Sequence, residues 1–272
     1  MNKYLQLFRL GNALMGIVGL TVASFMAVGT DVVNHGLDLV ISAIIVFLFI
    51  AGGNSLNDYI DVEIDKTAHP ERPVPSGRMT PIQARNIGIG TLGLSVVASL
   101  FTFDIACIAI VVIAAILMVS YELFLKQRGF VGNVTIAVLT GMLFLLGGAV
   151  VGDVMGNAIV ATMAALVSVG REIAKDIEDM GSDEGRNTLP MRIGVRSSAV
   201  LASFFFIIGP VLSVLPMIWG SYGILYYLVV VADLMFLYCS FIVHKDPHAA
   251  QRMAKKAMMF ALIAFILGVI PI

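Results

Sequence analysis

The fold of this 272-residue chain is decided by residues 38–65, DLVISAIIVFLFIAGGNSLNDYIDVEID, where a long apolar run ends in a cluster of carboxylates. The run from 38 to 58 is long enough to cross the roughly 30 Å hydrocarbon core of a bilayer as a helix. The carboxylates gather where that run ends, in the pattern N-D-x-x-D-x-x-x-D over residues 57–65. The stretch therefore predicts a membrane-spanning helix that presents acidic side chains at the membrane surface.

A second stretch, residues 157–183, repeats this arrangement. Its apolar part leads into REIAKDIEDMGSD at residues 171–183, with the acidic pattern D-x-x-D-x-x-x-D. Each of these three aspartates lies 118 positions after its counterpart in the first motif, which indicates an internal duplication. On a helix with about 100° between residues, positions i, i+3 and i+7 fall within an arc of roughly 60°. The spacing therefore predicts two acidic helix faces that can face each other.

Composition extends the membrane interpretation to the whole chain. Hydrophobic residues make up 59% and charged residues 13%, against roughly 45–50% and 25% in soluble domains, so a soluble enzyme is excluded. The net charge of −1 offers no basic field for nucleic acid. The cysteines and histidines show no ligand spacing, so we expect any metal to be held by oxygen. Nine apolar runs of spanning length are predicted, at 11–30, 38–58, 84–103, 105–124, 130–151, 157–178, 197–217, 222–243 and 253–272.

The charges between these runs predict the orientation. All 17 Lys and Arg residues fall on the side of the N-terminus, and none falls on the opposite side. Positive charge favours the cytoplasmic side of a membrane. We therefore predict a single all-α integral membrane domain over residues 1–272, multi-pass in the cell membrane, with the N-terminus and the acidic motifs cytoplasmic. Residues 59–85 and 179–196 are expected to be cytoplasmic loops that cap the site.

The two acidic motifs predict a phosphorylated ligand held through a metal. Six carboxylates in one mouth of low dielectric would repel one another unless a cation were present. Mg²⁺ commonly bridges one or two carboxylates to a substrate phosphate while it keeps several waters. Basic side chains in the same loops could bind the phosphate oxygens that the metal leaves uncovered; they are Arg72, Lys126, Arg128, Lys175 and Arg186.

The spans and paired motifs resemble the UbiA superfamily of intramembrane prenyltransferases over essentially the whole chain. Within it, the segments 69–77, 121–132 and 171–179 are most similar to the archaeal digeranylgeranylglyceryl phosphate synthases. The resemblance implies nine transmembrane helices around a central cavity, under a cytoplasmic cap. It also implies a Mg²⁺-dependent geranylgeranyltransferase. The donor would be geranylgeranyl diphosphate, and the acceptor would be the free glycerol hydroxyl of geranylgeranylglyceryl phosphate, which gives digeranylgeranylglyceryl phosphate for archaeal ether lipids.

The resemblance also implies roles for individual residues. The residues that would match catalytic metal ligands are Asn57, Asp61, Asp65, Asp176, Asp179 and Asp183. Glu172, one turn before the second motif, is a further catalytic candidate that would orient the acceptor. Substrate contacts are predicted for Asn54, Arg72, Tyr121, Lys126, Arg128 and Lys175. The lipid bilayer is the implied surrounding, and no obligatory protein partner is implied.

Three other functions fit part of the pattern. A prenyltransferase of the same superfamily could act instead on an aromatic acid, a quinone precursor or a haem. A multi-span transporter more often carries ionisable groups near the membrane midplane, where only Asp233 and Glu122 are candidates in this sequence. A CDP-alcohol phosphotransferase carries a compact D-G-x-x-A-R run, which this sequence lacks. The sequence does not determine the length of the prenyl chain.

Overall fold

Helices make up all the regular structure in residues 2–181 and 187–270, the parts of the chain that the computed structural model describes. The longer helices are α2 (Leu10–Val28), α3 (Gly36–Ile60), α5 (Pro81–Ser99), α6 (Ile105–Ser120), α7 (Phe130–Val150), α8 (Ala158–Asp179), α10 (Val195–Val211), α12 (Val229–Ile242) and α13 (Pro247–Val269). Shorter helices are α1 (Lys3–Leu7), α4 (Val62–Ala68), α9 (Leu189–Ile193) and α11 (Val214–Trp219). The predicted all-α class is confirmed.

Seven stretches of the described chain are long and apolar enough to cross a membrane, which confirms a multi-pass membrane protein. The first, Leu10–Ile60, has 51 residues and contains both α2 and α3. Helix α13 is not among the seven, because Arg252, Lys255 and Lys256 lie in its first half. The number of nine spans therefore stays a prediction.

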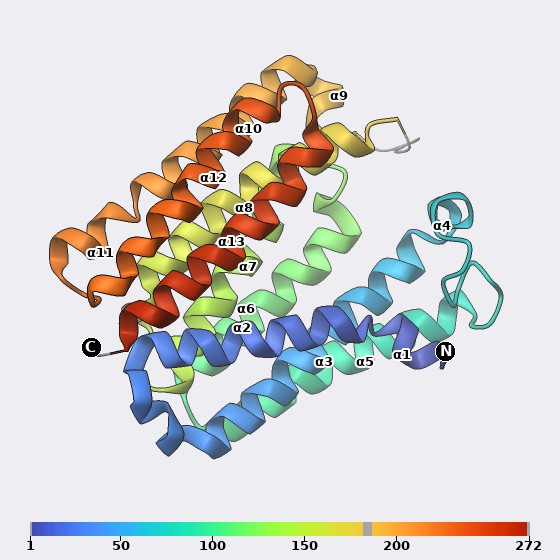
Figure 1. Cartoon of the computed structure of the whole chain (residues 1–272). Coiled ribbons are helices and arrows are strands. Elements are labelled where there is room, and N and C mark those ends of the chain that lie inside the picture. The colour runs from blue at the N-terminus through green and yellow to red at the C-terminus, as the bar shows by residue number, and fades with distance from the viewer. Residues whose placement is uncertain (1, 182–186, 271–272) are drawn as a thin grey trace.

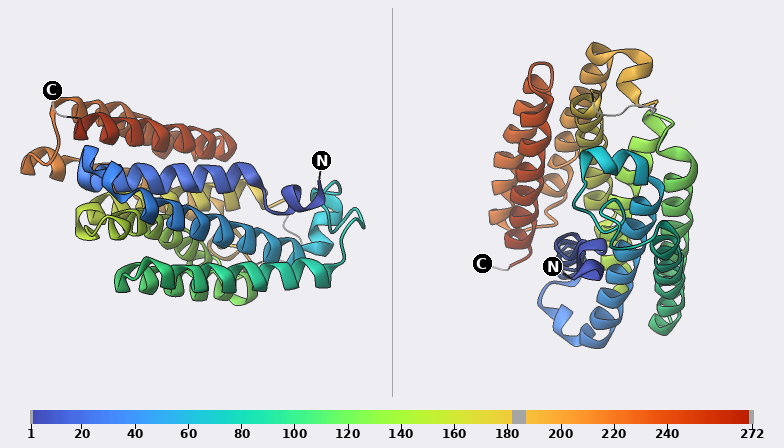
Figure 2. Two further views of the ribbon diagram at one scale, coloured as in Figure 1. Left: turned by 90° about the horizontal axis from the view of Figure 1, so that it is seen from below. Right: turned by 90° about the vertical axis from the view of Figure 1, so that its right-hand side faces the viewer.

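The long helices run beside one another in one bundle, and segments from distant parts of the sequence meet at its ends (Figure 1). Helices α1 and α4 lie at one end with the N-terminus, and α11 and the C-terminus lie at the other. Figure 2 shows α13 and α5 on opposite sides of the bundle. Between the two sides, α7 contacts both α2 and α8 and joins the first half of the chain to the second.

Glycines allow the close contact of α3 with α5. A Cβ atom on Gly52 would lie 2.6 Å from Leu92 Cγ and 2.9 Å from the Leu92 backbone nitrogen. A Cβ atom on Gly88 would lie 3.0 Å from the backbone nitrogen of Leu56. Small residues let membrane helices approach closely, since packing rather than the hydrophobic effect holds them together. The contact continues into the first acidic motif, where the guanidinium of Arg85 lies 6.0 Å from the ring centroid of Tyr59, so it fixes the position of the helix end that carries the motif.

The structure confirms one predicted boundary and corrects another. The turn predicted between 84–103 and 105–124 is present, because Phe103 adopts a left-handed φ of 50° and Asp104 caps α6 through the backbone N–H of Cys107. The stretches 59–85 and 179–196 were expected as loops but contain α4 and α9. Helix α5 also begins early, at Pro81, because Thr80 and Gln83 form a capping box.

Candidate active site

A cavity of about 260 Å³ lies between the two acidic motifs. Its polar lining comes from α3, α4, α7, α8 and the connecting segments, and comprises Arg9, Asn57, Asp61, Asp65, His69, Arg72, Tyr121, Lys126, Asn133, Glu172, Lys175, Asp176, Asp179 and Thr188. The structure thus brings the two motifs to one site, as their common spacing predicts. Most of the residues predicted to contact substrate line the same cavity.

Two predicted site residues lie outside the cavity lining, and a third is not among the described residues. Asn54 donates from Nδ2 to the carbonyl oxygen of Phe8 at 3.1 Å and does not line the cavity. Arg128 is exposed and also lies outside the lining. Asp183, like the basic residue Arg186, falls outside the described residues. The other ten of the thirteen predicted site residues line the cavity.

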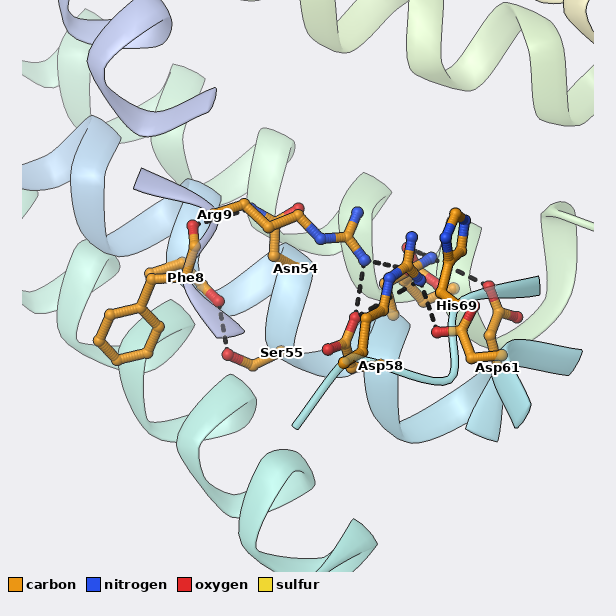
Figure 3. Close-up of polar contacts among 12 residues, drawn as sticks. Phe8, Arg9, Asn54, Ser55, Asp58, Asp61 and His69 are labelled. Atoms are coloured by element: carbon orange, nitrogen blue, oxygen red, sulfur yellow. Dashed lines mark hydrogen bonds and ion pairs between the residues drawn. The ribbon is translucent and has the colours of Figure 1, made fainter. Parts of the chain in front are cut away.

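In the first motif, carboxylates and arginines form a buried network (Figure 3). Asp58 exposes 1% of its side chain and pairs with Arg9 at 2.7 Å, with Arg72 at 3.8 Å from the same oxygen. Arg72 also pairs with Asp65 at 2.5 Å. A guanidinium group suits such contacts because its fixed donors can bind two partners at once. Asp58 thereby anchors two positive charges beside the cavity without lining it itself.

Lys126 connects the first motif to α6. Its Nζ lies 2.6 Å from Asp61 Oδ2 and 3.3 Å from Glu122 Oε2, and its side chain is only 10% exposed. Residues Tyr121–Leu125 form a π-helical turn, in which the backbone N–H of Lys126 donates to the carbonyl of Tyr121. Such turns are rare and occur often at functional sites. This turn places Lys126 over the carboxylate of Asp61, which explains how Lys126 lines the cavity.

Arg9 lines the cavity, although the sequence indicates it only as one of the positive charges that predict the membrane orientation. It sits at the break between α1 and α2 with a left-handed backbone, φ 49° and ψ 62°. From there its guanidinium donates to Asn57 Oδ1 at 3.0 Å as well as to Asp58 (Figure 3). A positive φ costs free energy in a residue with a side chain and is tolerated where the surroundings hold it. The first predicted span begins close to this break, at Gly11, but no Gly or Pro stands at residue 9 itself, so the sequence does not indicate that Arg9 takes this conformation.

Helix α1 holds the loop that follows α4. Leu7 is fully buried against Val74 and Met79 of that loop. Gln6 donates to the carbonyl of Glu71 at 3.0 Å and accepts from Arg78 at 2.7 Å. Because the same loop carries Arg72, these contacts fix Arg72 and Arg9 relative to each other.

The second motif behaves as its helical spacing predicts. Asp176 and Asp179 line the cavity, whereas Glu178 faces α13, where it contacts His248 and accepts from Gln251 at 3.2 Å. Asn133 of α7 donates from Nδ2 to Asp176 Oδ2 at 2.9 Å. Asn133 was not predicted as a site residue. An isolated Asn early in an apolar run gives no sequence signal for a partner 43 positions away.

The donor atoms of this cavity fit a hard divalent cation. Among the described residues, no three His, Cys, Asp or Glu side chains form a group that could hold a metal ion by themselves. The polar lining nevertheless offers the amide oxygen of Asn57 and carboxylate oxygens from both motifs. Mg²⁺ rarely uses a closed protein cage; it takes one or two carboxylates together with substrate phosphate and water. Oxygen donors divided between the two motifs therefore fit a cation whose coordination is completed by a phosphorylated ligand.

A second, apolar cavity of about 410 Å³ adjoins the polar one. Side chains of α3, α6 and α7 line it, and Ile136 borders both cavities. Its lining includes Ile45, Phe49, Ile110, Met118 and Leu143. An apolar chamber beside a polar mouth suits a molecule with a charged head and a long hydrocarbon chain.

Comparison with known proteins establishes the family. The model of the UbiA prenyltransferase family matches residues 17–268. The chain belongs to the UbiA prenyltransferase family. Relatives include the digeranylgeranylglyceryl phosphate synthases of Methanosarcina mazei, 36% identical over 98% of both chains, and of Thermococcus gammatolerans, 37% identical over 94% of both. The predicted family and the enzyme class, a prenyltransferase, are confirmed.

Solved structures of UbiA proteins share the fold. A structure of digeranylgeranylglyceryl phosphate synthase matches with a TM-score of 0.83 and 32% identity, covering 98% of this chain and 97% of that one. A UbiA homologue from Archaeoglobus fulgidus, bound to DMAPP and Mg²⁺, matches with a TM-score of 0.64 and 14% identity, covering 97% and 99%. The bundle described above is therefore the UbiA fold.

Proposed function

We propose that this UbiA protein transfers a geranylgeranyl group from geranylgeranyl diphosphate to the free glycerol hydroxyl of geranylgeranylglyceryl phosphate, with Mg²⁺, to give digeranylgeranylglyceryl phosphate. The single observation that carries the proposal is the cavity in which both acidic motifs meet Arg72 and Lys126, beside an apolar chamber. The choice of acceptor is supported by full-length identity of 36% to a digeranylgeranylglyceryl phosphate synthase.

We further propose nine membrane spans with the cavity on the cytoplasmic side. Leu10–Ile60 contains two long helices, and α13 has 23 residues, which is enough to cross a bilayer. The one-sided distribution of Lys and Arg supports the orientation. On this arrangement, α4 with the loop to Thr80, and α9, form the described part of the cap over the site.

The residues of the cavity wall would act on the donor's leaving group. When bound, Mg²⁺ supplies positive charge that stabilises the diphosphate oxygens as the C–O bond breaks. Lys126 and Arg72 are held beside the same place by Asp61 and Asp65, so they can donate to those oxygens without reorganising. The diphosphate leaves with the electron pair of that bond. The apolar chamber keeps water from the allylic carbon.

Glu172 is the proposed partner of the acceptor hydroxyl. It lines the cavity, and Arg171 donates to its Oε1 at 2.6 Å, which fixes the carboxylate. The hydroxyl oxygen forms the new ether bond to the first carbon of the prenyl chain, and Glu172 takes the hydroxyl proton. The products are then the ether lipid and inorganic diphosphate.

The test is transfer of a radiolabelled geranylgeranyl group by the detergent-purified protein. Geranylgeranylglyceryl phosphate and 4-hydroxybenzoate are offered separately, each with Mg²⁺ or with EDTA. A labelled diether that forms only with Mg²⁺ supports the proposal. Labelled benzoate in its place would keep the fold and the donor chemistry but reject the lipid acceptor. No product with either acceptor would contradict the proposed reaction.

A further inference from the structure

Two residues that line the cavity each carry a buried polar atom with no hydrogen-bond partner in the described part of the chain. The two atoms are Oδ1 of Asn133 and Oγ1 of Thr188. The two residues are only 6% and 4% exposed. A buried polar atom without a partner costs about 1–3 kcal/mol, so such atoms are few and call for an explanation. Two of them on one cavity indicate a ligand that supplies the missing partners.

Thr188 stands at a helix start but does not cap it. It is the residue before α9, where a threonine oxygen ordinarily accepts from a backbone N–H of the first turn. Here no such side-chain bond forms, and Pro190, with no N–H, occupies one of the two positions that would donate. The hydroxyl of Thr188 is thus left for another partner.

Asn133 is fixed by its other amide atom. Because Nδ2 donates to Asp176 at 2.9 Å, Oδ1 must point away from that carboxylate. The start of α7 also touches the start of α9, since a Cβ atom on Gly129 would lie 3.2 Å from the backbone nitrogen of Leu189. Asn133 lies one turn after Gly129, so Asn133 and Thr188, which carry the two unpartnered atoms, lie on the same side of the cavity.

The hydrogen-bonding capacity of these atoms separates the two substrates. An amide oxygen can only accept, so Oδ1 of Asn133 needs a ligand that donates. An ionised prenyl diphosphate carries acceptor oxygens only. A glyceryl phosphate offers both kinds of group, a hydroxyl that donates and phosphate oxygens that accept. The Thr188 hydroxyl can donate to the latter.

We propose that Asn133 and Thr188 form the binding site for the head group of the acceptor. Thr188 Oγ1 donates a hydrogen bond to an acceptor phosphate oxygen, and Asn133 Oδ1 accepts one from the free glycerol hydroxyl while the acceptor docks. That hydroxyl then turns to Glu172, which takes its proton as the ether bond forms. This inference rests on the proposed function and assigns specificity for a phosphorylated glyceryl ether to the α7–α9 wall. The opposite wall, with Arg72 and Lys126, then serves the diphosphate of the donor.

The test compares Thr188→Val with Thr188→Ser and with Thr135→Val. Thr135 is an equally buried threonine of α7 that bonds only its own helix, at Val131 O, and does not line the cavity. Thr188→Val should raise the KM for geranylgeranylglyceryl phosphate roughly tenfold or more, the value of a hydrogen bond to a charged group. Its KM for geranylgeranyl diphosphate should not change. The Ser variant and the Thr135 control should both keep the wild-type KM for the acceptor.

Two further measurements keep the test independent of folding and of turnover. Binding of the unreactive analogue geranylgeranyl thiolodiphosphate with Mg²⁺ should be unchanged in Thr188→Val. The dephosphorylated acceptor, geranylgeranylglycerol, should react equally with Thr188→Val and wild type, because it lacks the phosphate that Thr188 binds. Asn133→Ala should lower kcat/KM for both acceptors, since both carry the glycerol hydroxyl.

The results that overturn the proposal are distinct from those that overturn the function. An unchanged acceptor KM in Thr188→Val would reject the Thr188 contact. An unchanged kcat/KM for both acceptors in Asn133→Ala would reject the contact of that amide oxygen with the glycerol hydroxyl. If the wild-type protein transfers nothing to geranylgeranylglyceryl phosphate, the proposed function and this inference both fail before any variant is compared.

Discussion

Removing the positive charge of Lys126 should slow transfer severely, while the protein becomes less stable but stays folded. Its ammonium group lies 2.6 Å from Asp61 and 3.3 Å from Glu122, and the three side chains expose only 10%, 10% and 5% of their surface. In Lys126→Met, two nearly buried carboxylates lose their shared cation. Removing one partner of a buried ion pair lowers the free energy of unfolding by about 3–5 kcal/mol. The polar cavity beside these carboxylates favours the lower end of that range.

The effect on transfer follows from the role of Lys126 at the leaving group. Loss of one preorganised donor at a developing oxyanion typically lowers kcat by roughly 10²–10³. The assay is the initial rate of labelled diether formation at saturating substrates, with the apparent unfolding temperature in detergent measured on the same samples. Lys66→Met is the matched control, because Lys66 forms an exposed pair with Glu63 at 2.7 Å, and such pairs contribute about 0–1 kcal/mol. A rate for Lys126→Met within threefold of wild type would refute the assignment of this lysine to the leaving group.

Three further outcomes follow from the geometry. Asp179→Ala should abolish transfer with the protein still folded, whereas Asp38→Ala, at the end of α3 away from the first motif, should leave the rate unchanged. Equal rates in the two variants would contradict the two-motif site. EDTA should stop the wild-type reaction until Mg²⁺ is restored. Arg72→Ala should raise the KM for geranylgeranyl diphosphate at least tenfold, while Arg128→Ala, exposed and outside the cavity, should change it less than threefold. Gly88→Val should lower the unfolding temperature or prevent folding, because the valine side chain would meet the backbone of Leu56. An unfolding temperature equal to that of wild type would show that α3 and α5 can separate without loss of stability.

The sequence predicts the parts of this site that follow from local helical geometry. Asp176 and Asp179 share a face of α8 because residues three apart lie within about 60° of each other on a helix, and Glu178 faces the other way for the same reason. The equal offset of the two motifs also predicts correctly that both meet at one cavity. These inferences need no knowledge of which helices are neighbours.

Contacts that depend on breaks in the helices are not predictable in this way. Arg9 reaches the first motif only because the chain turns between α1 and α2 at a residue with a positive φ. Lys126 and Arg128 are two positions apart, and the π-helical turn before them directs Lys126 toward Asp61 while Arg128 remains exposed. Thr188 becomes a cavity residue only through the contact of α9 with the start of α7. Each of these depends on tertiary packing, for which the sequence carries no periodic signal.

The duplicated motifs do not have duplicated roles. Asp58 and Asp176 occupy equivalent positions in the repeat, yet Asp176 lines the cavity and Asp58 does not. Helix α8 is unbroken from Asp176 to Asp179. In the first motif, by contrast, α3 ends at Ile60 and α4 begins at Val62, so the motif spans a break between two helices.

Across that break Asn57 and Asp61 face the cavity, and Asp58 is turned into the protein, where it holds Arg9 and Arg72. A wall that anchors several cations suits the three negative charges of a fully ionised prenyl diphosphate. A wall whose aspartate is oriented by a neutral amide, with a hydroxyl beside it, suits the hydroxyl and single phosphate of an acceptor. On the proposed function, the asymmetry of the repeat would let one cavity distinguish the two substrates that it joins.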